Sequence, residues 1–248
     1  MIDVSGLTWV EPAAGAGAFL ADVPDPIAID IEPTDALDPR ISQADFMTWT
    51  PAATAMTPLL FYGNPPFGRQ ATLAKAFIQR AASFPNTKAI AFILPRSFQK
   101  PSMQRAIPPR FHCASSEELP LNSFQVNGTP HNVPCVFQIW VRRETDRPRS
   151  AQEVPVGFTY VKQTDTHHLI IRRVGVYAGA GYLPSTEQRS VQSHYFIELE
   201  PEHRSRAATI ASALTAHTFP SNTTGPRSLS KGEITEVLNN LLAEDTPA

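Results

Sequence analysis

The chain has 248 residues, of which 42% are hydrophobic and 18% charged, and its formal net charge is −2. This length allows one large domain, or a domain with a smaller companion, and a substantial core. No stretch of about 18 apolar residues occurs, and the first residues lack a basic region followed by an apolar one, so we expect neither a spanning helix nor a secretory signal. Cys113 and Cys135 form no Cys-x-x-Cys pair, which argues against a metal site or a disulfide framework and favours a cytoplasmic location.

The charges are unevenly distributed along the sequence. Residues 1–59 carry a net charge of −8, residues 60–150 carry +8, and residues 151–248 carry −2. An acidic first third suits a cationic cofactor, and a basic middle third suits a polyanion. The alternative is that these blocks are solvated faces on opposite sides of one domain.

The first third predicts short strands separated by turns. Residues 7–10 form an apolar strand that leads into a glycine-containing turn at 15–20, where glycines let the backbone approach a ligand closely. We expect a helix of about two turns to follow, because little chain separates this turn from the next strand. That strand, residues 26–33, has the acid Asp30 near its carboxyl end, and residues 41–46 form a third element.

The next stretch, residues 59–68, contains the most informative pattern of the sequence. Four apolar residues predict a short buried strand, which runs into Gly63, Asn64, two prolines, Phe67 and Gly68. The prolines fix their own backbone and hold Asn64 extended just beyond the strand end, where open α/β sheets bind ligands. The Asn64 side-chain carbonyl and the Pro65 carbonyl then offer acceptors for an amino group, and Phe67 offers a flat face. A plain strand-to-helix turn is the alternative.

Taken together, Glu11-Pro12-Ala13-Ala14-Gly15-Ala16-Gly17-Ala18-Phe19 and Asn64-Pro65-Pro66-Phe67 resemble the signatures of the S-adenosylmethionine-dependent amino-methyltransferases. Among these, the DNA adenine-N6 methyltransferases are most similar, and the resemblance covers residues 7–140. It implies a Rossmann-like class I fold, a seven-stranded, mostly parallel sheet with an antiparallel terminal hairpin, and S-adenosylmethionine as cofactor. Catalytic roles are implied for Asn64, Pro65, Pro66 and Phe67.

The resemblance also implies the cofactor-binding residues. Glu11, Ala13, Gly15 and Gly17 would line the methionine end of the cofactor. Asp30 would hold its ribose, and Ile31 would pack on its adenine. Asp45, followed by Phe46, would accept from the adenine amino group, and Asn64 would face both cofactor and substrate.

The middle of the chain continues the strand–helix–strand pattern of a parallel sheet. Residues 70–83 have helical spacing, and residues 88–94 are a continuous apolar strand. The basic segment that follows is read as a nucleic-acid contact through Arg96, Lys100 and Arg105, with solubilising surface charge as the alternative. Residues 121–126 and 133–140 predict the antiparallel hairpin.

The last hundred residues differ in character. Residues 1–145 are predicted to be the cofactor-binding catalytic domain, residues 151–200 a β-rich target-recognition segment, and residues 201–248 C-terminal helices. Tyr177 and Tyr182, in a glycine-rich loop, could contact nucleic acid or simply form a β-loop. Ser230 and Glu233 predict a capping box for a helix over residues 231–242. This helix could replace the cofactor-covering helix that the family carries before its first strand, or it could pack elsewhere.

The function predicted from these patterns is methyl transfer to the N6 amine of adenine in DNA. Asn-Pro-Pro-aromatic sequences also occur in enzymes that methylate RNA base amines or a protein glutamine amide, so these substrates stay open. The basic middle third favours nucleic acid over protein and does not separate DNA from RNA. An inactive nucleic-acid-binding subunit that keeps the fold is the alternative from another class.

Overall fold

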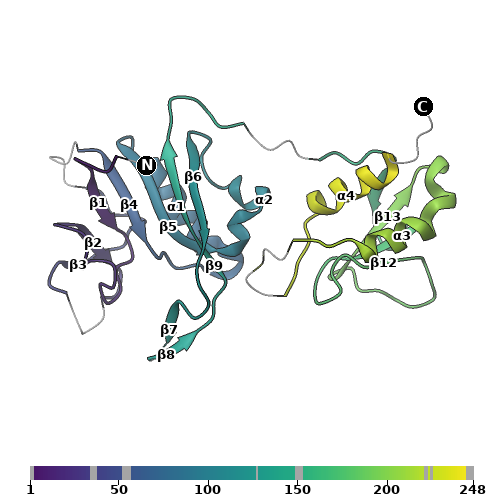
Figure 1. The fold of residues 1–248 in the computed structure, drawn as a ribbon, viewed down its shortest axis with the longest axis horizontal. Helices are drawn as coiled ribbons and strands as arrows, with labels where there is room; N and C mark the ends of the chain where they lie inside the picture. The colour runs from purple at the N-terminus through teal and green to yellow at the C-terminus, as the bar shows by residue number, and fades with distance from the viewer. Residues whose placement is uncertain are drawn as a thin grey trace. The chain divides into compact units, whose positions relative to one another are not determined.

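The computed structural model describes residues 3–33, 38–51, 57–126, 128–148, 153–220, 223 and 226–243. The chain forms two compact units that divide between residues 149 and 150 (Figure 1). The predicted β-rich segment and the predicted C-terminal helices, treated separately in the sequence, lie together in the second unit.

The first unit is built on a seven-stranded sheet. Its strands, in chain order, are β1 (Thr8–Glu11), β2 (Ile27–Asp30), β3 (Ile41–Gln43), β4 (Leu59–Gly63), β5 (Thr87–Pro95), β6 (Phe111–Glu118) and β9 (Cys135–Arg142). Their spatial order is β3-β2-β1-β4-β5-β9-β6. Strands β1 to β5 pair in parallel, whereas β9 is antiparallel to both β5 and β6. The predicted Rossmann-like class I methyltransferase fold is therefore confirmed.

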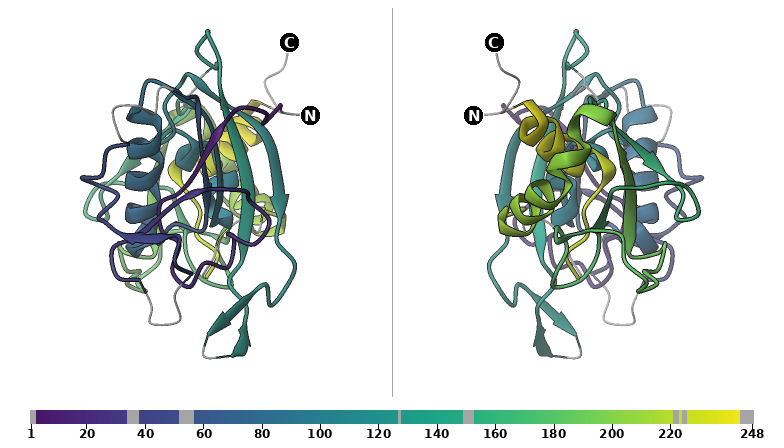
Figure 2. Two further views of the ribbon diagram at one scale, coloured as in Figure 1. Left: turned by 90° about the vertical axis from the view of Figure 1, so that its left-hand side faces the viewer. Right: turned by 90° about the vertical axis from the view of Figure 1, so that its right-hand side faces the viewer.

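The central strands of the sheet are apolar because both of their faces are buried. All five residues of β4 are buried, which is why this strand is a continuous apolar run rather than an alternating one. One face of the sheet is covered by α1 (Thr72–Ser83) (Figure 2). Ala74 and Ile78 of this helix belong to the same buried cluster as Phe61 and Ile90 of the sheet. On the opposite face, Leu60, Tyr62, Ala89 and Ala91 form a second, smaller cluster.

The connection from β4 to α1 has an unusual backbone. Gly68 has φ 67°, and the next element, the 3-10 turn η1 (Arg69–Ala71), places Gln70 at φ 53° and Ala71 at φ 57°. Left-handed backbone costs a residue with a side chain about 1–2 kcal/mol. The diproline corner and the start of α1 are therefore joined by a strained segment.

Two predicted elements of the first unit differ from the structure. Residues 15–25 form consecutive turns rather than a helix. The partner of β9 on the side away from β5 is β6, not residues 121–126. Those residues contribute only β7 (Phe124–Val126), which pairs with β8 (Thr129–His131) in a separate two-stranded hairpin. The basic segment after β5 forms the short helices η2 (Arg96–Gln99) and α2 (Pro101–Gln104).

The second unit is a four-stranded antiparallel sheet with helices packed on it. The strands β10 (Phe158–Val161), β11 (Leu169–Arg172), β12 (Gly181–Tyr182) and β13 (His194–Leu199) have the order β10-β13-β11-β12. The turn η3 (Pro201–Arg206) leads into α3 (Ala207–Ala216), and α4 (Lys231–Ala243) follows. One face of the sheet, including Leu169 and Ile197, shares a core with Leu214 of α3 and Leu238 of α4.

The capping box predicted for α4 is confirmed. The backbone N–H of Ser230 donates to Glu233 Oε2 at 2.8 Å, and the Glu233 N–H donates to Ser230 Oγ at 3.3 Å. The apolar side of α4 is used inside its own unit, where Ile234, Leu238 and Leu242 are buried. Coverage of a cofactor by α4 stays a prediction, and it would have to use another side of this helix. None of the described helices is long and apolar enough to cross a membrane.

Candidate active site

Three predicted residues lie at the carboxyl ends of neighbouring parallel strands. Glu11 ends β1, Asp30 ends β2, and Asn64 directly follows β4. Strands β2 and β4 lie on either side of β1, so the chain order reverses beside β1. This reversal is a topological switch point, and open α/β sheets bind ligands outside the carboxyl ends of their strands at such a point.

Glu11 is a fully buried carboxyl group. Burial raises its pKa to about 7, the neighbouring Tyr62 hydroxyl opposes this rise, and the nearby charge of Asp30 adds to it. The Tyr62 hydroxyl nevertheless falls short of a well-formed hydrogen bond, and neither carboxylate oxygen of Glu11 has a partner among the described residues. Gly63 packs directly on this carboxyl, since a Cβ at Gly63 would lie 3.2 Å from Glu11 Oε1.

The glycine turn after β1 is held by Asp30. The Gly15 N–H donates to Asp30 Oδ2 at 2.7 Å, and the Glu32 N–H donates to Asp30 Oδ1 at 2.9 Å. Gly15 has φ 53°, and a Cβ on it would meet no atom within 4 Å, so the turn is open on that side. Ala13 is half-buried and Gly17 has φ 81°. The turn therefore presents backbone to free space beside two carboxyl groups.

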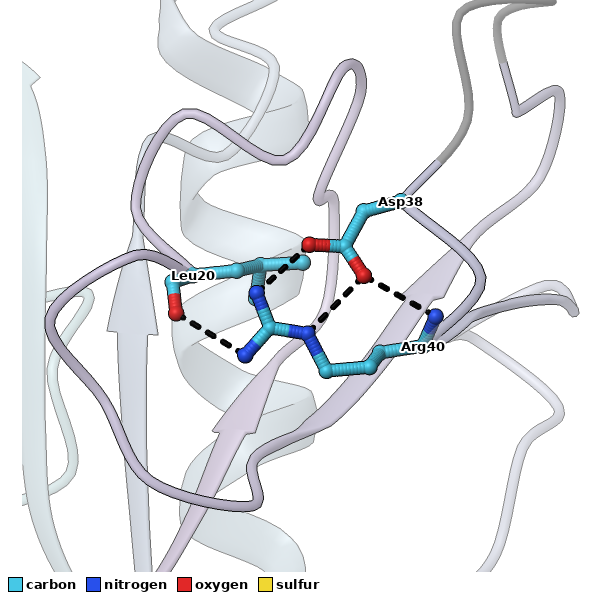
Figure 3. A network of polar contacts seen from close by, with 3 residues as sticks. All are labelled: Leu20, Asp38 and Arg40. Carbon is cyan, nitrogen blue, oxygen red and sulfur yellow. Dashed lines mark hydrogen bonds and ion pairs between the residues drawn. The ribbon is translucent and has the colours of Figure 1, made fainter.

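An ion pair braces the far side of this turn. Arg40 donates from Nη1 to the Leu20 carbonyl at 3.1 Å and from Nε to Asp38 Oδ1 at 2.8 Å (Figure 3). The hydrogen bonds from the Arg40 side chain and backbone to the Asp38 carboxylate lower the pKa of Asp38 to about 2. A Cβ on Gly17 would lie 3.3 Å from Asp38 Cβ, so the bracing residues pack closely against the turn.

The diproline corner lies at the end of β4 as predicted. Pro65 is buried, Pro66 is exposed, and Asn64 and Phe67 are partly buried. The Asn64 Oδ1 atom is buried and accepts no hydrogen bond from the part of the chain that the structure describes. The Phe67 carbonyl accepts from the backbone of Leu73 and Ala74 at 3.2 and 3.3 Å, which ties the corner to the first turn of α1.

The residues predicted around the cofactor's adenine differ among themselves. Ile31 is 65% exposed and is available to pack on a flat ring. Asp45 Oδ1 accepts from the Met47 N–H at 2.8 Å, which orients the carboxylate. Phe46 is only 2% exposed, because its ring lies in the main core against Phe61. A contact of Phe46 with a ligand would therefore have to come from its backbone.

The basic residues predicted to contact nucleic acid also occupy different environments. Arg96 forms an ion pair with Glu118 at 3.0 Å. Lys100 is only 6% exposed, so its side chain does not lie on the surface of the unit. Arg105 is exposed. A nucleic-acid contact from this segment stays a prediction, and Arg105 is the residue best placed to make it.

The sequence reasoning missed Tyr62, although a signal for it exists. In the register of β1 with β4, Val10 pairs with Phe61, so Glu11 lies beside Tyr62 on the same face. Tyr62 is two positions before Asn64 and is the polar-tipped residue in an otherwise apolar strand. A buried hydroxyl usually has a hydrogen-bonding role, which would have singled it out.

A hollow of about 750 Å³ adjoins Tyr62 on the sheet face opposite α1. Its wall is mainly apolar and includes Val4, Trp9, Tyr62, Phe137, Ile139 and Arg143. Gly63 and Phe19 also line it, so it reaches the same end of β4 as the candidate site.

No family model and no curated protein sequence matches this chain. Among solved structures, the chain is similar to the 23S rRNA methyltransferase ErmE, with a TM-score of 0.40 and 16% identity over 59% of this chain and 65% of ErmE. It is also similar to TrmN from Thermus thermophilus, with a TM-score of 0.37 and 17% identity over 56% of this chain and 44% of TrmN. The chain thus spans less than two thirds of the length of either protein.

Proposed function

We propose that the first unit transfers a methyl group from S-adenosylmethionine to an amino group on a nucleobase, with the N6 amine of adenine as the acceptor. One observation supports the proposal above all. The Glu11 carboxylate, the Tyr62 hydroxyl and Asn64 Oδ1 are buried at the ends of the neighbouring strands β1 and β4, with no hydrogen-bond partner in the described ranges. An unpaired buried polar group costs about 1–3 kcal/mol, so this edge is suited to ligands that bring hydrogen-bond donors.

The residues present fit the cofactor that the fold implies. Glu11 would accept a hydrogen bond from the ammonium group of S-adenosylmethionine, and the open side of Gly15 would admit the methionine end of the cofactor. Asp30 would accept hydrogen bonds from the ribose hydroxyls. Each Asp30 oxygen already accepts one backbone N–H and keeps a lone pair free. When bound, S-adenosylmethionine supplies a methyl group made electrophilic by a positively charged sulfur.

Asn64 and Pro65 would orient the acceptor amine. The Asn64 Oδ1 and Pro65 carbonyl oxygens would each accept one N–H of the amine, which raises electron density on its nitrogen and aims its lone pair at the methyl group. Neither oxygen is basic enough to hold a proton, so the amine's proton would leave to water after transfer. Fixed orientation of this kind supplies much of the rate enhancement of two-substrate reactions.

Phe67 would hold the base. A base inside a duplex cannot reach the corner, so the substrate would be flipped out or already unpaired. The Phe67 side chain packs against the main core, and its backbone carbonyl accepts hydrogen bonds from the start of α1, so the residue is anchored at the corner. Loss of this ring in Phe67→Ala is expected to weaken base binding by about 1–3 kcal/mol, measured with unpaired oligonucleotides.

A labelled-methyl assay on DNA, RNA and protein tests the substrate class. The proposal expects label on adenine, in DNA as the sequence patterns suggest or in RNA. Label on glutamine alone would contradict the nucleobase proposal. Calorimetry tests the cofactor step separately, because an inactive subunit that has lost cofactor binding would give no heat with S-adenosylmethionine.

Asn64→Ala tests the chemistry. We expect turnover to fall on the order of 100-fold, as for the loss of one preorganised polar group, with cofactor affinity nearly unchanged. Asn132→Ala is a matched control, because Asn132 is exposed beyond β8. Wild-type turnover in Asn64→Ala would refute the proposed role of the corner.

A further inference from the structure

The second unit contains a basic and aromatic hollow of about 260 Å³ beside β10 and β13. Its lining includes Tyr160, Lys162, Arg173, His194, Tyr195 and Lys231. No acidic residue is among its described lining residues. Residues 151–248 carry a net charge of −2, so this grouping of cations departs from the composition of the unit around it.

Two of the cations lie over aromatic rings. The Arg173 guanidinium carbon is 5.0 Å from the centre of the Tyr195 ring, and Lys231 Nζ is 4.5 Å from the centre of the Tyr160 ring. Arg173 Nε makes no hydrogen bond within the described part of the chain. Arg173 thus lines the hollow with its guanidinium beside a ring and with a buried Nε donor that has no partner in the described residues.

The two rings are held rigidly. The Tyr160 hydroxyl donates to the Lys231 carbonyl at 3.0 Å and lies 3.1 Å from Thr235 Oγ1, while the Tyr195 hydroxyl donates to the Leu229 carbonyl at 3.3 Å. The ring centres are 5.6 Å apart at an angle of 75°. The aromatic surfaces beneath the two cations are consequently held in place, which lowers the entropy lost when a ligand binds.

His194 adds a ring nitrogen that can form a hydrogen bond with a ligand. It is 7% exposed, and its Nδ1 lies 3.1 Å from the Ser190 carbonyl oxygen. Nδ1 also lies 3.0 Å from the Ser193 hydroxyl oxygen, so it has a partner inside the unit in either tautomer, donating to the Ser190 carbonyl or accepting from the Ser193 hydroxyl. Nε2 is buried and has no partner in the residues described.

We propose that this hollow binds single-stranded nucleic acid, with phosphates on Lys162 and Lys231, a base against Arg173, and a polar group of a base or sugar hydrogen-bonded to His194 Nε2. Sites for single strands combine cations that follow the backbone with flat groups that stack on bases. The volume is below the 300–1,000 Å³ typical of sites for drug-sized ligands and suits part of one nucleotide of a longer chain. The carboxylates of an acidic peptide would satisfy the cations but would bring no planar base to stack on Arg173.

This inference goes beyond the proposed methyl transfer, because it concerns binding by the second unit and can fail or succeed independently. The test measures the affinity of the full chain for labelled single-stranded RNA and DNA oligonucleotides, without cofactor, at several salt concentrations. The variants are the double substitution Arg173→Gln with Lys231→Gln, the single substitution Arg173→Lys, and Arg204→Gln as a control. Arg204 belongs to the same unit, and its side chain contacts the Leu199 carbonyl and Glu198 instead.

The double variant should bind at least tenfold more weakly, and its slope of log affinity against log salt should be shallower by about 0.7, because Lys231 is the one phosphate contact that it removes from a single strand. Arg173→Lys should keep the slope and still bind more weakly, because a lysine cannot stack. Arg204→Gln should behave as the wild type. Circular dichroism confirms that each variant is folded. Wild-type affinity and slope in the folded double variant would overturn the proposal. Equally tight binding of inorganic polyphosphate would also overturn it, because the hollow would then recognise charge alone.

Discussion

Replacing Glu11 by Gln should stabilise the ligand-free protein at high pH and weaken its function. The pKa of this fully buried carboxyl rises from its usual 4.5 to about 7 on folding. Below pH 4.5 the group is protonated in both states and costs nothing. Between pH 4.5 and 7 the unfolded chain releases this proton while the folded protein keeps it, so stability falls, and above pH 7 the folded protein holds a buried charge and the loss is complete.

The size of this effect follows from the two pKa values. At pH 8 the penalty is about 3 kcal/mol, at 1.36 kcal/mol for each tenfold change in proton affinity, and at pH 5 it is below about 1 kcal/mol. Glu11→Gln has nearly the same shape and no charge, so it should recover most of this energy. Urea denaturation of both proteins at pH 5 and pH 8 measures the difference. A stability difference that is the same at both pH values would refute the reasoning.

The same substitution should impair cofactor binding. Loss of a hydrogen bond to a charged group costs about 1.5–3 kcal/mol, so S-adenosylmethionine should bind Glu11→Gln on the order of 10- to 100-fold more weakly. In the wild type, a cation beside Glu11 should lower its pKa and expel a proton. Calorimetry at pH 6 in buffers with different ionisation enthalpies should therefore show proton release in the wild type and none in the variant.

Gly63→Ala should destabilise the first unit by about 1–3 kcal/mol, because Gly63 has φ 117° and an added Cβ would press on Glu11. Gly15→Ala should cost nearer 1 kcal/mol, because an added Cβ there would meet no neighbouring atom. Urea denaturation of the two variants measures the difference. Asp30→Asn should weaken cofactor binding about tenfold or more by calorimetry, since it replaces a charge-assisted hydrogen bond to the glycine turn by a neutral one. Ser230→Ala should cost the second unit about 0.5–2 kcal/mol by loss of the α4 cap. If α4 also covers the cofactor, that variant should lower cofactor affinity as well, and an unchanged affinity would count against the prediction.

Local sequence signals predicted the central strands and the corner. The continuous apolar runs of β4 and β5 identify strands covered on both faces, and the two prolines after Asn64 mark where β4 ends. Because the strands are parallel, their carboxyl ends lie together, which places Glu11, Asp30 and Asn64 at the same end of the sheet.

The elements that were mispredicted depend on tertiary context. Only Phe111 of β6 is buried, so this strand shows no apolar pattern and is held in the sheet by its pairing with β9. A helix before β2 does not form because Pro24 and Pro26 interrupt a connection that is already short. Nothing local to Phe46 tells whether its ring faces a ligand or the core, since its neighbours Phe61 and Phe77 come from other elements.

Trp9 lines the hollow opposite α1, so its fluorescence can report when a molecule enters this hollow. The chain has three tryptophans: Trp140 is 1% exposed, Trp49 packs against the main core, and Trp9 lines the hollow with its ring centre 5.3 Å from that of Tyr62. Indole emission shifts with the polarity around the ring, so whatever enters this space should change the fluorescence of Trp9 while leaving the other two indoles undisturbed. Occupancy next to the end of β4 can thus be followed in solution without attaching a dye.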